Sequence, residues 1–467
     1  MTSRPALITI GDSRDEVYEQ IEDFAKKSHL EAVRYLREKY GFDLIYQDQI
    51  VRNKQMMLSQ IEEVQKQGAE AVIFFFPIWG PAHLVVIGSR KLNCPVLLLT
   101  NKKPHTAGLV GLTLAGAALD EVGIKHKRVW GELNENETVK EVTSFIKASS
   151  VVYKMRGQTY GVFGGRTLGM YSATADLAQC QRIFGVDIEH IDQLEIVREA
   201  EKFSAEIVNR YINWFKNHCG YVETDGKVVN EAKFQRQIRS YLAVKKITWE
   251  MKLDFIGVKC MPELGDKYVN QCLSCALMND PYDAEGPKEP TVYACEADHN
   301  GALTMQILKL LSEGKSTVLM DVRHIIQPEN IYVFCNCGAM ATWFAGHSDD
   351  PSVNLKNVHL RPQIQGKAGG FSTQFISKAG EATLARLCRK KGEYWMAIFK
   401  GNFIEQPREK LKETSFPWPH AFVKMQVEPK YFIETFGSNH IHAVMGDYIQ
   451  ELKELCELLE IRSKIYC

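Results

Sequence analysis

The chain has 467 residues, of which 45% are hydrophobic and 10% aromatic, and its 57 lysines and arginines balance 57 aspartates and glutamates. At about 100 to 200 residues per domain this length predicts two to four domains, and we expect three. The balanced charge excludes the strong basic field typical of nucleic-acid or anionic-membrane binding, so a small, weakly charged ligand is the expected partner.

The first residues lack the basic stretch and following apolar segment that mark a secretory signal. A cytoplasmic location is therefore expected. The longest apolar block, Ala71–Trp79, is about half the length that a bilayer needs and contains Pro77, which predicts no membrane span. The twelve cysteines are then expected to be reduced thiols, mostly buried as small hydrophobic residues.

Residues 1–152 alternate strand and helix patterns, which predict a doubly wound, mostly parallel sheet. The loops after its first and third strands carry Arg14 and Trp79, which places both at the edge of the sheet that faces ligands. Neither loop matches the Gly-x-Gly-x-x-Gly dinucleotide fingerprint or a P-loop, so no nucleotide site is predicted. The expected strands are Ala6–Ile10, Phe42–Tyr46, Ala71–Phe76, Pro95–Thr100 and Val129–Trp130, and the expected helices are Glu16–Lys39 and Met56–Gly68.

A second α/β domain is predicted over residues 153–325, and it opens with the strand Tyr160–Phe163. The loop Gly164–Gly169 that follows contains three glycines and an arginine. It suits either an anion held by backbone amides or a tight turn, and we favour the turn. The next expected elements are the helices Ala173–Phe184 and Asp192–Phe215 and the strand Asp254–Val258.

Two short apolar runs near the end of this domain each stop at a carboxylate. Thr291–Cys295 and Thr317–Met320 are predicted strands, Glu296 and Asp321 follow them, and helical spacing lies between the two. A strand–helix–strand unit would put both acids at carboxyl ends of strands, on the edge that faces the ligand crevice. There they could bind a metal, act as acid and base, or do both; the alternative is that each only caps the following turn.

Four cysteines have spacings that also occur in zinc sites. Cys272 and Cys275 form a Cys-x-x-Cys pair, and Cys335 and Cys337 form a Cys-x-Cys pair. A structural zinc needs polar, turn-forming surroundings, whereas the first pair lies in an apolar helical pattern. We therefore expect core thiols.

A β-rich domain is predicted over residues 326–467, as a largely antiparallel sheet or barrel. Near its end, His440 and His442 lie two residues apart, on one face of an extended segment. The expected segments are Val353–Leu360, Phe371–Phe375, Tyr394–Gly401 and Ala421–Val427, followed by a final amphipathic helix, Tyr448–Leu459.

Two carboxylates and one of these histidines make an oxygen-rich donor set that leaves coordination positions open. Such a set favours Mn²⁺, or another divalent cation such as Mg²⁺ or Co²⁺, over a closed zinc site. On the residues alone, His440 and His442 are rivals for the third ligand.

The chain resembles the L-fucose/L-arabinose isomerase family, particularly its L-fucose isomerase-like branch. The resemblance covers all but the first third closely, and the first domain is similar in kind. It implies two α/β domains followed by a β-rich domain, a metal-dependent aldose–ketose isomerase activity, and assembly into homo-oligomers, either trimers or hexamers. The motifs that carry it are GGRTLGMY (164–171), GVKCMPEL (257–264), ACEADHNGALT (294–304), LMDVRH (319–324), PHAFVKM (419–425) and FGSNHIHAVMGDY (436–448).

Carried onto this sequence, the resemblance implies that Glu296, Asp321 and His440 are the metal ligands and that the two carboxylates are also the catalytic proton-transfer groups. Trp418 and Asn439 would line the sugar site. One departure concerns Met261, which stands where relatives often have a substrate-contacting glutamine.

The resemblance further implies composite active sites, in which Arg14 and Trp79 reach the sugar bound by a neighbouring chain. A local interpretation competes with it. Trp79 would then cover its own sheet, and Arg14 would pair with Asp12 or Glu16.

The implied reaction interconverts an aldose and a ketose, on a pentose, a 6-deoxyhexose or a 6-modified hexose of the L-fucose/D-arabinose type, by enediol proton transfer. The alternative function is a non-catalytic sugar-binding or regulatory protein that retains the fold. That alternative predicts a lost ligand, and none of the three implied ligands is missing. A redox or nucleotide-dependent enzyme is disfavoured because the phosphate loop is absent.

Overall fold

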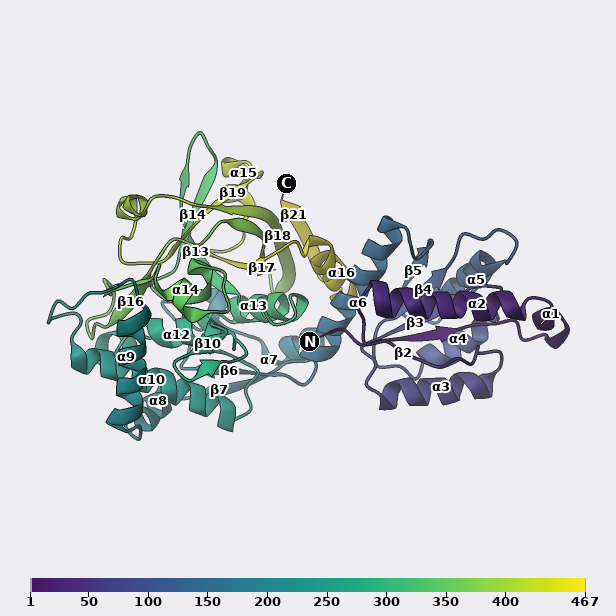
Figure 1. The fold of residues 1–467 in the computed structure, drawn as a ribbon, viewed down its shortest axis with the longest axis horizontal. Coiled ribbons are helices and arrows are strands. Elements are labelled where there is room, and N and C mark those ends of the chain that lie inside the picture. Colours follow the sequence, from purple (N-terminus) through teal and green to yellow (C-terminus); the bar gives the residue numbers. More distant parts are fainter. Residues whose placement is uncertain (1, 467) are drawn as a thin grey trace. The chain divides into compact units, whose positions relative to one another are not determined.

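The computed structural model describes residues 2–466, which form two compact units (Figure 1). The first contains the chain up to Met155 and Gln450–Glu460, and the second contains Arg156–Ile449 and the chain from Ile461 onward. The division at residues 152 and 325 stays a prediction, although residues 450–460 cluster with the first unit. Across residues 2–466, no helix is both long enough and apolar enough to cross a membrane.

The first unit is built around a parallel sheet. Within the described chain, the strands of this sheet follow the order β2-β1-β3-β4-β5. This confirms the predicted doubly wound architecture. The strands are β1 (Pro5–Thr9), β2 (Ile45–Tyr46), β3 (Ala71–Phe76), β4 (Val96–Thr100) and β5 (His126–Trp130). The helices are α1 (Asp15–Glu19), α2 (Glu22–Arg34) with a π-helical turn (Tyr35–Lys39), α3 (Lys54–Lys66), α4 (Ala82–Ser89), α5 (Gly108–Glu121), α6 (Asn136–Met155) and α16 (Ile449–Leu459).

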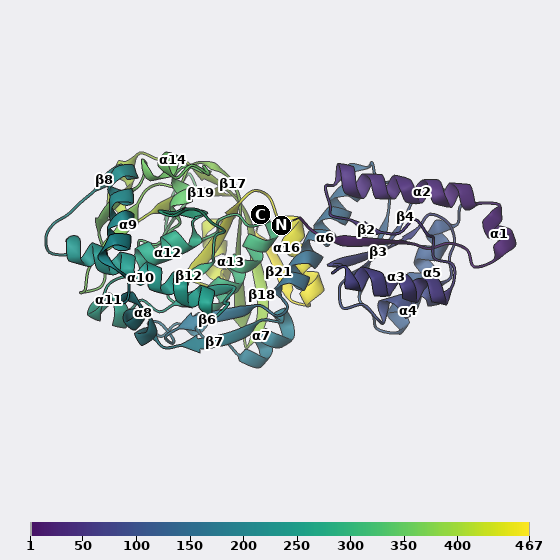
Figure 2. The ribbon, with the colours of Figure 1, turned by 60° about the horizontal axis from the view of Figure 1, so that its bottom comes forward.

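Alternate strand residues of this sheet face two separate cores. Phe74 and Leu98 pack with α3, α4 and α5, whereas Ile73 and Leu97 pack with α2 and α6. Figure 2 shows α2 on one side of the sheet and α3 and α4 on the other. Because both faces are covered, a strand such as Ala71–Phe76 can be apolar at every position.

The helix predicted over Glu16–Lys39 is interrupted between α1 and α2. The backbone of Ile21 leaves the helical region there, with φ −128° and ψ 3°. The side chain of Ile21 packs against a small core that includes Tyr18, Ile50 and Ile78. Tertiary packing therefore overrides the local helical pattern at this position.

The second unit begins with a parallel sheet whose strands, in the part of the chain that is described, follow the order β12-β9-β6-β7. The predicted helix Asp192–Phe215 is split into two helices, because the chain turns at residues 201–204. The strands are β6 (Thr159–Phe163), β7 (Asp187–Ile191), β9 (Phe255–Val258) and β12 (Tyr293–Cys295). The helices are α7 (Leu177–Phe184), α8 (Gln193–Ala200), α9 (Ala205–His218), α10 (Glu231–Glu250), α11 (Glu263–Lys267), α12 (Cys272–Asn279) and α13 (His299–Leu311).

An antiparallel barrel follows, in green to yellow in Figure 1. Among the described residues, its strands follow the order β17-β20-β13-β14-β19-β18, and β17 pairs back onto β18 to close the ring. A further strand, β21, adds to β18 in parallel. The strands are β13 (Val318–Ile326), β14 (Ile331–Cys335), β17 (Gly380–Lys390), β18 (Glu393–Ile404), β19 (His420–Met425), β20 (His440–Met445) and β21 (Arg462–Tyr466). The barrel confirms the β-rich C-terminal region.

The strand that carries Asp321 differs from the prediction. β13 does not stop at Met320 but continues to Ile326, and it pairs with β14 and β20 in the barrel rather than with β12. Asp321 therefore lies inside an antiparallel strand, not at the carboxyl end of a parallel one. The strand continues because residues 321–326 find hydrogen-bonding partners in β14, with one register shift between Val322 and His324.

The segment Val353–Leu360 is also not a single strand. A short helix, α14 (Pro351–Leu355), forms because Pro351 occupies its first turn and Asp350 accepts a hydrogen bond from the Ser352 amide, 2.9 Å away. The remaining short α-helix is α15 (Pro429–Thr435), and the remaining strands are β8 (Tyr221–Val222), β10 (Tyr282–Asp283), β11 (Gly286–Pro287), β15 (His359–Pro362) and β16 (Phe371–Gln374).

The return of α16 to the first unit predicts that this helix stabilises it. Leu458 of α16 packs against the core formed with α2 and α6, and Glu454 pairs with Lys127 of β5. We expect Leu458→Asp to lower the free energy of unfolding by about 1 to 3 kcal/mol and to speed hydrogen–deuterium exchange in α6. The matched control is Leu30→Asp on α2, where the leucine is 56% exposed and the change should be under about 0.5 kcal/mol. Equal effects of the two substitutions would contradict the role of α16.

Candidate active site

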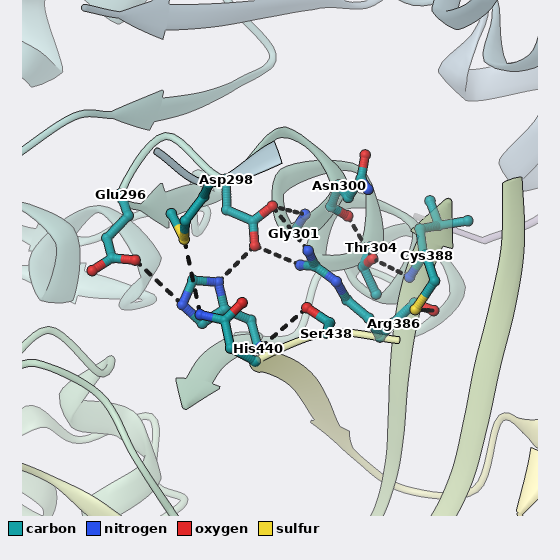
Figure 3. Close-up of polar contacts among 12 residues, drawn as sticks. Glu296, Asp298, Asn300, Gly301, Thr304, Arg386, Cys388, Ser438 and His440 are labelled. Atoms are coloured by element: carbon teal, nitrogen blue, oxygen red, sulfur yellow. Dashed lines mark hydrogen bonds and ion pairs between the residues drawn. The ribbon is translucent and has the colours of Figure 1, made fainter. Parts of the chain in front are cut away.

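His440 lies between two carboxylates that come from different sheets. Its Nε2 atom is 3.2 Å from Oδ1 of Asp321 and 3.4 Å from Oε2 of Glu296. Asp321 and His440 are opposite each other in the β13–β20 ladder, so their side chains are neighbours on one face of the barrel. Glu296 follows the last residue of β12, and Figure 3 shows its carboxylate pointing toward the His440 ring. The structure thus brings together the three residues predicted as ligands.

The backbone that carries Glu296 is strained. Glu296 and Ala297 have φ angles of 60° and 50°, in the left-handed region that residues with a Cβ atom rarely adopt. The turn is held by hydrogen bonds that the Ala297 amide donates to the Val258 carbonyl (3.1 Å) and the Asp298 amide donates to the Cys295 carbonyl (3.3 Å). This turn directs Glu296 away from the parallel sheet and toward the barrel strands.

The two ring nitrogens of His440 have different surroundings. Nδ1 is 2.6 Å from Oδ2 of Asp298, whereas Nε2 is buried and has no partner with hydrogen-bond geometry in the described chain. Burial alone would lower the pKa of His440, but the hydrogen bond to Asp298 and the carboxylates of Asp321 and Glu296 raise this pKa well above its usual value. The surroundings therefore favour a positive charge on the His440 ring itself.

His442, the rival third ligand, points into a different environment. A Cβ atom built on Gly301 of α13 would lie 2.8 Å from its Nε2, so this ring packs closely against the helix. Burial and the nearby Arg386 guanidinium lower the pKa of His442 well below its usual value. Of the two histidines, His440 is the one beside the carboxylates.

Asn439 and Trp418 have different positions around this group. Asn439 is exposed directly before His440, and its amide nitrogen is 3.9 Å from the Met170 sulfur, which brings the loop after β6 to the site. Trp418 is buried and donates from Nε1 to Oε1 of Gln363 at 2.8 Å. Gln363 in turn donates to the Cys337 carbonyl, and the Cys337 sulfur contacts Cys295 of β12. These contacts connect Trp418 to β12 rather than to the carboxylates.

Arg14 and Trp79 belong to the first unit and lie together there. The Arg14 guanidinium carbon is 4.9 Å from the centre of the Trp79 ring, and Asp12 accepts from Nε at 3.0 Å and from Nη2 at 2.6 Å. The local pairing of Arg14 with Asp12 is thus present. The Arg14 side chain is still 63% exposed, so its outer face is open to a ligand.

The N-terminal and C-terminal parts of the chain match two domain models of one protein family. Residues 4–157 match the family model described as L-fucose isomerase, first N-terminal domain, and residues 334–466 match the one described as L-fucose isomerase, C-terminal domain. The chain belongs to the L-fucose isomerase family. It is 23% identical over 439 residues to a protein of Priestia megaterium named sulfoquinovose isomerase, with 91% of each chain covered. It is 24% identical over 430 residues to a protein of Haemophilus influenzae named L-fucose isomerase, covering 76% of this chain and 73% of that relative.

Two buried charged residues of this L-fucose isomerase family member, Asp298 and Arg386, were not predicted from the sequence. Asp298 stands where an N-cap of α13 is expected, and its carboxylate accepts from the Gly301 amide at 3.1 Å. Arg386 is a lone charge within the apolar middle of β17, between Ala385 and Leu387, a pattern that predicts a buried and paired charge. These patterns could have indicated both residues, though not that they meet.

Of the four cysteines with zinc-like spacing, Cys272, Cys275 and Cys335 are buried and Cys337 is half-buried. Cys272 and Cys275 are on α12, and burial raises the pKa of both thiols well above the usual value. Cys335 is in β14, whereas the Cys337 sulfur is 3.4 Å from the sulfur of Cys295. This packing suits core thiols.

We predict that these four cysteines hold no zinc. Replacing Cys272 and Cys275 by alanine should lower thermal stability, because two buried side chains shrink, and should leave the metal content of the purified protein unchanged. Elemental analysis of the wild-type and variant proteins measures this directly. A stoichiometric zinc that disappears with the two thiols would contradict the prediction.

Proposed function

We propose that this protein is a metal-dependent aldose–ketose isomerase whose active site is formed by Glu296, Asp321 and His440. The observation that carries the proposal is the buried Nε2 of His440, which faces both carboxylates at 3.2 and 3.4 Å and has no hydrogen-bond partner within the described chain. Membership of the L-fucose isomerase family supports the same chemistry.

The donor chemistry of these residues fits a divalent cation. Across residues 2–466, no three such side chains already form a metal cluster, so the proposal depends on the kind of donor rather than on preformed coordination. Two carboxylate oxygens and one imidazole nitrogen suit Mn²⁺, Mg²⁺ or Co²⁺ and leave positions open for a ligand. Held by Glu296, Asp321 and His440, such a cation would stabilise the negative charge that develops on the sugar oxygens.

Glu296 and Asp321 are suited to the proton transfers that isomerisation requires. The reaction moves one proton between C1 and C2 of the sugar and another between the two oxygens attached to them. Since the carboxylates approach Nε2 from different sheets, a sugar bound beside His440 can meet one on each side. One carboxylate then takes the proton from carbon and returns it to the neighbouring carbon, while the other exchanges the oxygen-bound proton.

The proposed substrate is a pentose, a 6-deoxyhexose or a 6-modified hexose. The names of the two relatives described above, a sulfoquinovose isomerase and an L-fucose isomerase, support this range. At Met261 the chain presents an apolar thioether that lies over Gly265, in place of an amide that could hydrogen-bond a hydroxyl. A panel of D-arabinose, L-fucose and a 6-sulfo hexose, assayed for ketose formation, tests the range.

We predict that activity depends on a removable metal and on the three proposed ligands. Protein treated with EDTA should lose aldose–ketose interconversion and regain it on addition of Mn²⁺. Glu296→Gln and Asp321→Asn should each reduce kcat by about 100- to 10,000-fold, and His440→Ala should weaken Mn²⁺ binding at least about tenfold.

The matched control for His440→Ala is His442→Ala, which removes an equally buried imidazole on the same strand. The folded variant should bind Mn²⁺ with wild-type affinity in an equilibrium titration. If His442→Ala loses the metal and His440→Ala retains it, the assignment of the two histidines is reversed. A wild-type protein that interconverts no sugar of the panel in the presence of Mn²⁺ would favour the non-catalytic binding function instead.

The protein is further proposed to act as a homo-oligomer, a trimer or hexamer, in which Arg14 and Trp79 of one chain contact the sugar held by another. The exposed face of the Arg14–Trp79 pair supports this. The prediction is that Arg14→Ala and Glu296→Gln are each inactive, and that mixing them with subunit exchange restores part of the activity. Some interfaces between subunits of the two variants would then combine an intact Arg14 with an intact Glu296. No recovery after proven exchange would place Arg14 outside a shared site.

A further inference from the structure

We propose that Asp298 and Arg386 are positioning residues that hold His440 in the one tautomer and orientation in which Nε2 can bind the cation. The inference depends on the proposed function, because it assigns a task within the same site. Both side chains are 0% exposed, so they act through His440 rather than by touching a sugar.

Arg386 and Asp298 form an ion pair that is fully shielded from solvent. Nη1 of Arg386 donates to Oδ2 of Asp298 at 2.6 Å, and Nη2 donates to Oδ1 at 3.1 Å, with both side chains 0% exposed. Figure 3 shows the Asp298 carboxylate between the guanidinium and the His440 ring. A buried ion pair of this kind is often no more stabilising than apolar residues of similar size, so folding stability alone does not explain its presence.

Apart from His440, the hydrogen-bond partners of the Asp298 carboxylate within the described chain are donors. Oδ2 accepts from Arg386 and lies 2.6 Å from Nδ1 of His440, whereas Oδ1 accepts from Arg386 and from the Gly301 amide. A carboxylate that is ionised by its pairing with Arg386 can only accept. The proton between the ring and Oδ2 therefore belongs on Nδ1. In the neutral ring this tautomer leaves the lone pair on Nε2, which is the atom that faces Asp321 and Glu296.

Asp298, Arg386 and His442 pack closely around Gly301. A Cβ atom on Gly301 would lie 3.0 Å from the Asp298 carboxyl carbon, 2.8 Å from Nε2 of His442 and 3.1 Å from Nη1 of Arg386. The carboxylate, the guanidinium and the second imidazole are thus packed against the first turn of α13. His440 cannot turn its ring without breaking its contact with Asp298.

The first test is Asp298→Asn, which keeps the shape of the side chain and replaces one acceptor with a donor. If the new NH₂ group takes the place of Oδ2, it faces Nδ1 of His440 and drives the ring to the tautomer with a proton on Nε2. If it takes the place of Oδ1, it faces Arg386 and the Gly301 amide, which also donate. We expect the dissociation constant for Mn²⁺, measured by electron paramagnetic resonance titration, to rise at least about tenfold.

A second variant keeps the test decisive if Asp298→Asn fails to fold. Asp298→Ser combined with Arg386→Met removes the buried pair without leaving a net charge, and serine still caps α13 but is too short to reach Nδ1. This double variant should fold and should also bind Mn²⁺ at least about tenfold more weakly. The matched control is Thr304→Val, which removes a buried hydroxyl that accepts from the Leu387 amide at 3.0 Å on the same α13–β17 contact.

Thr304→Val should lower the melting temperature yet keep the wild-type dissociation constant for Mn²⁺. If the Asp298 variants bind Mn²⁺ as tightly as the wild type, or lose no more affinity than Thr304→Val, the positioning role is wrong while the proposed function stands. If the wild-type protein itself binds no Mn²⁺, Mg²⁺ or Co²⁺, the proposed function and the inference both fail.

Discussion

The buried ion pair between Arg386 and Asp298 fixes how the two halves of the candidate active site meet. Asp298 caps α13, the helix that follows the parallel sheet, while Arg386 belongs to the barrel strand β17. Because a buried charge must stay paired, this contact holds the start of α13 against the barrel. Glu296 is only two residues before Asp298, so the same contact sets its distance from Asp321 and His440. The geometry of the site is thus determined at the boundary between two sheets.

Local patterns were sufficient for the elements that depend on neighbours in the sequence. The parallel sheet of the first unit, the strand before Glu296 and the buried helix around Cys272 all appear as predicted, because their apolar periodicity reflects burial directly. The early end predicted for the Asp321 strand was wrong. Its first four residues look the same whether a strand stops or continues, and its partners β14 and β20 come later in the chain.

Long-range pairing also explains why the sequence did not show which site residues lie close together. Family resemblance indicated Glu296, Asp321 and His440, but the physical reason for their proximity is the register of the β13–β20 ladder, which no local pattern encodes. Asp298 and Arg386 are 88 residues apart, and each has an ordinary local interpretation, as a helix cap and as a strand residue. Only the closed barrel shows that they must pair.

The three proposed ligands differ in how accessible they are, and this difference matches their proposed tasks. The His440 side chain is 1% exposed and is held by Asp298 at Nδ1, whereas the side chains of Glu296 and Asp321 are 18% and 35% exposed. A group that only holds a cation gains from rigidity, but a group that exchanges protons with a sugar must reach it. The strain in the left-handed turn at Glu296, of order 1 to 3 kcal/mol, is consistent with this division. It brings a carboxylate from the parallel sheet to a histidine that the barrel already holds in place.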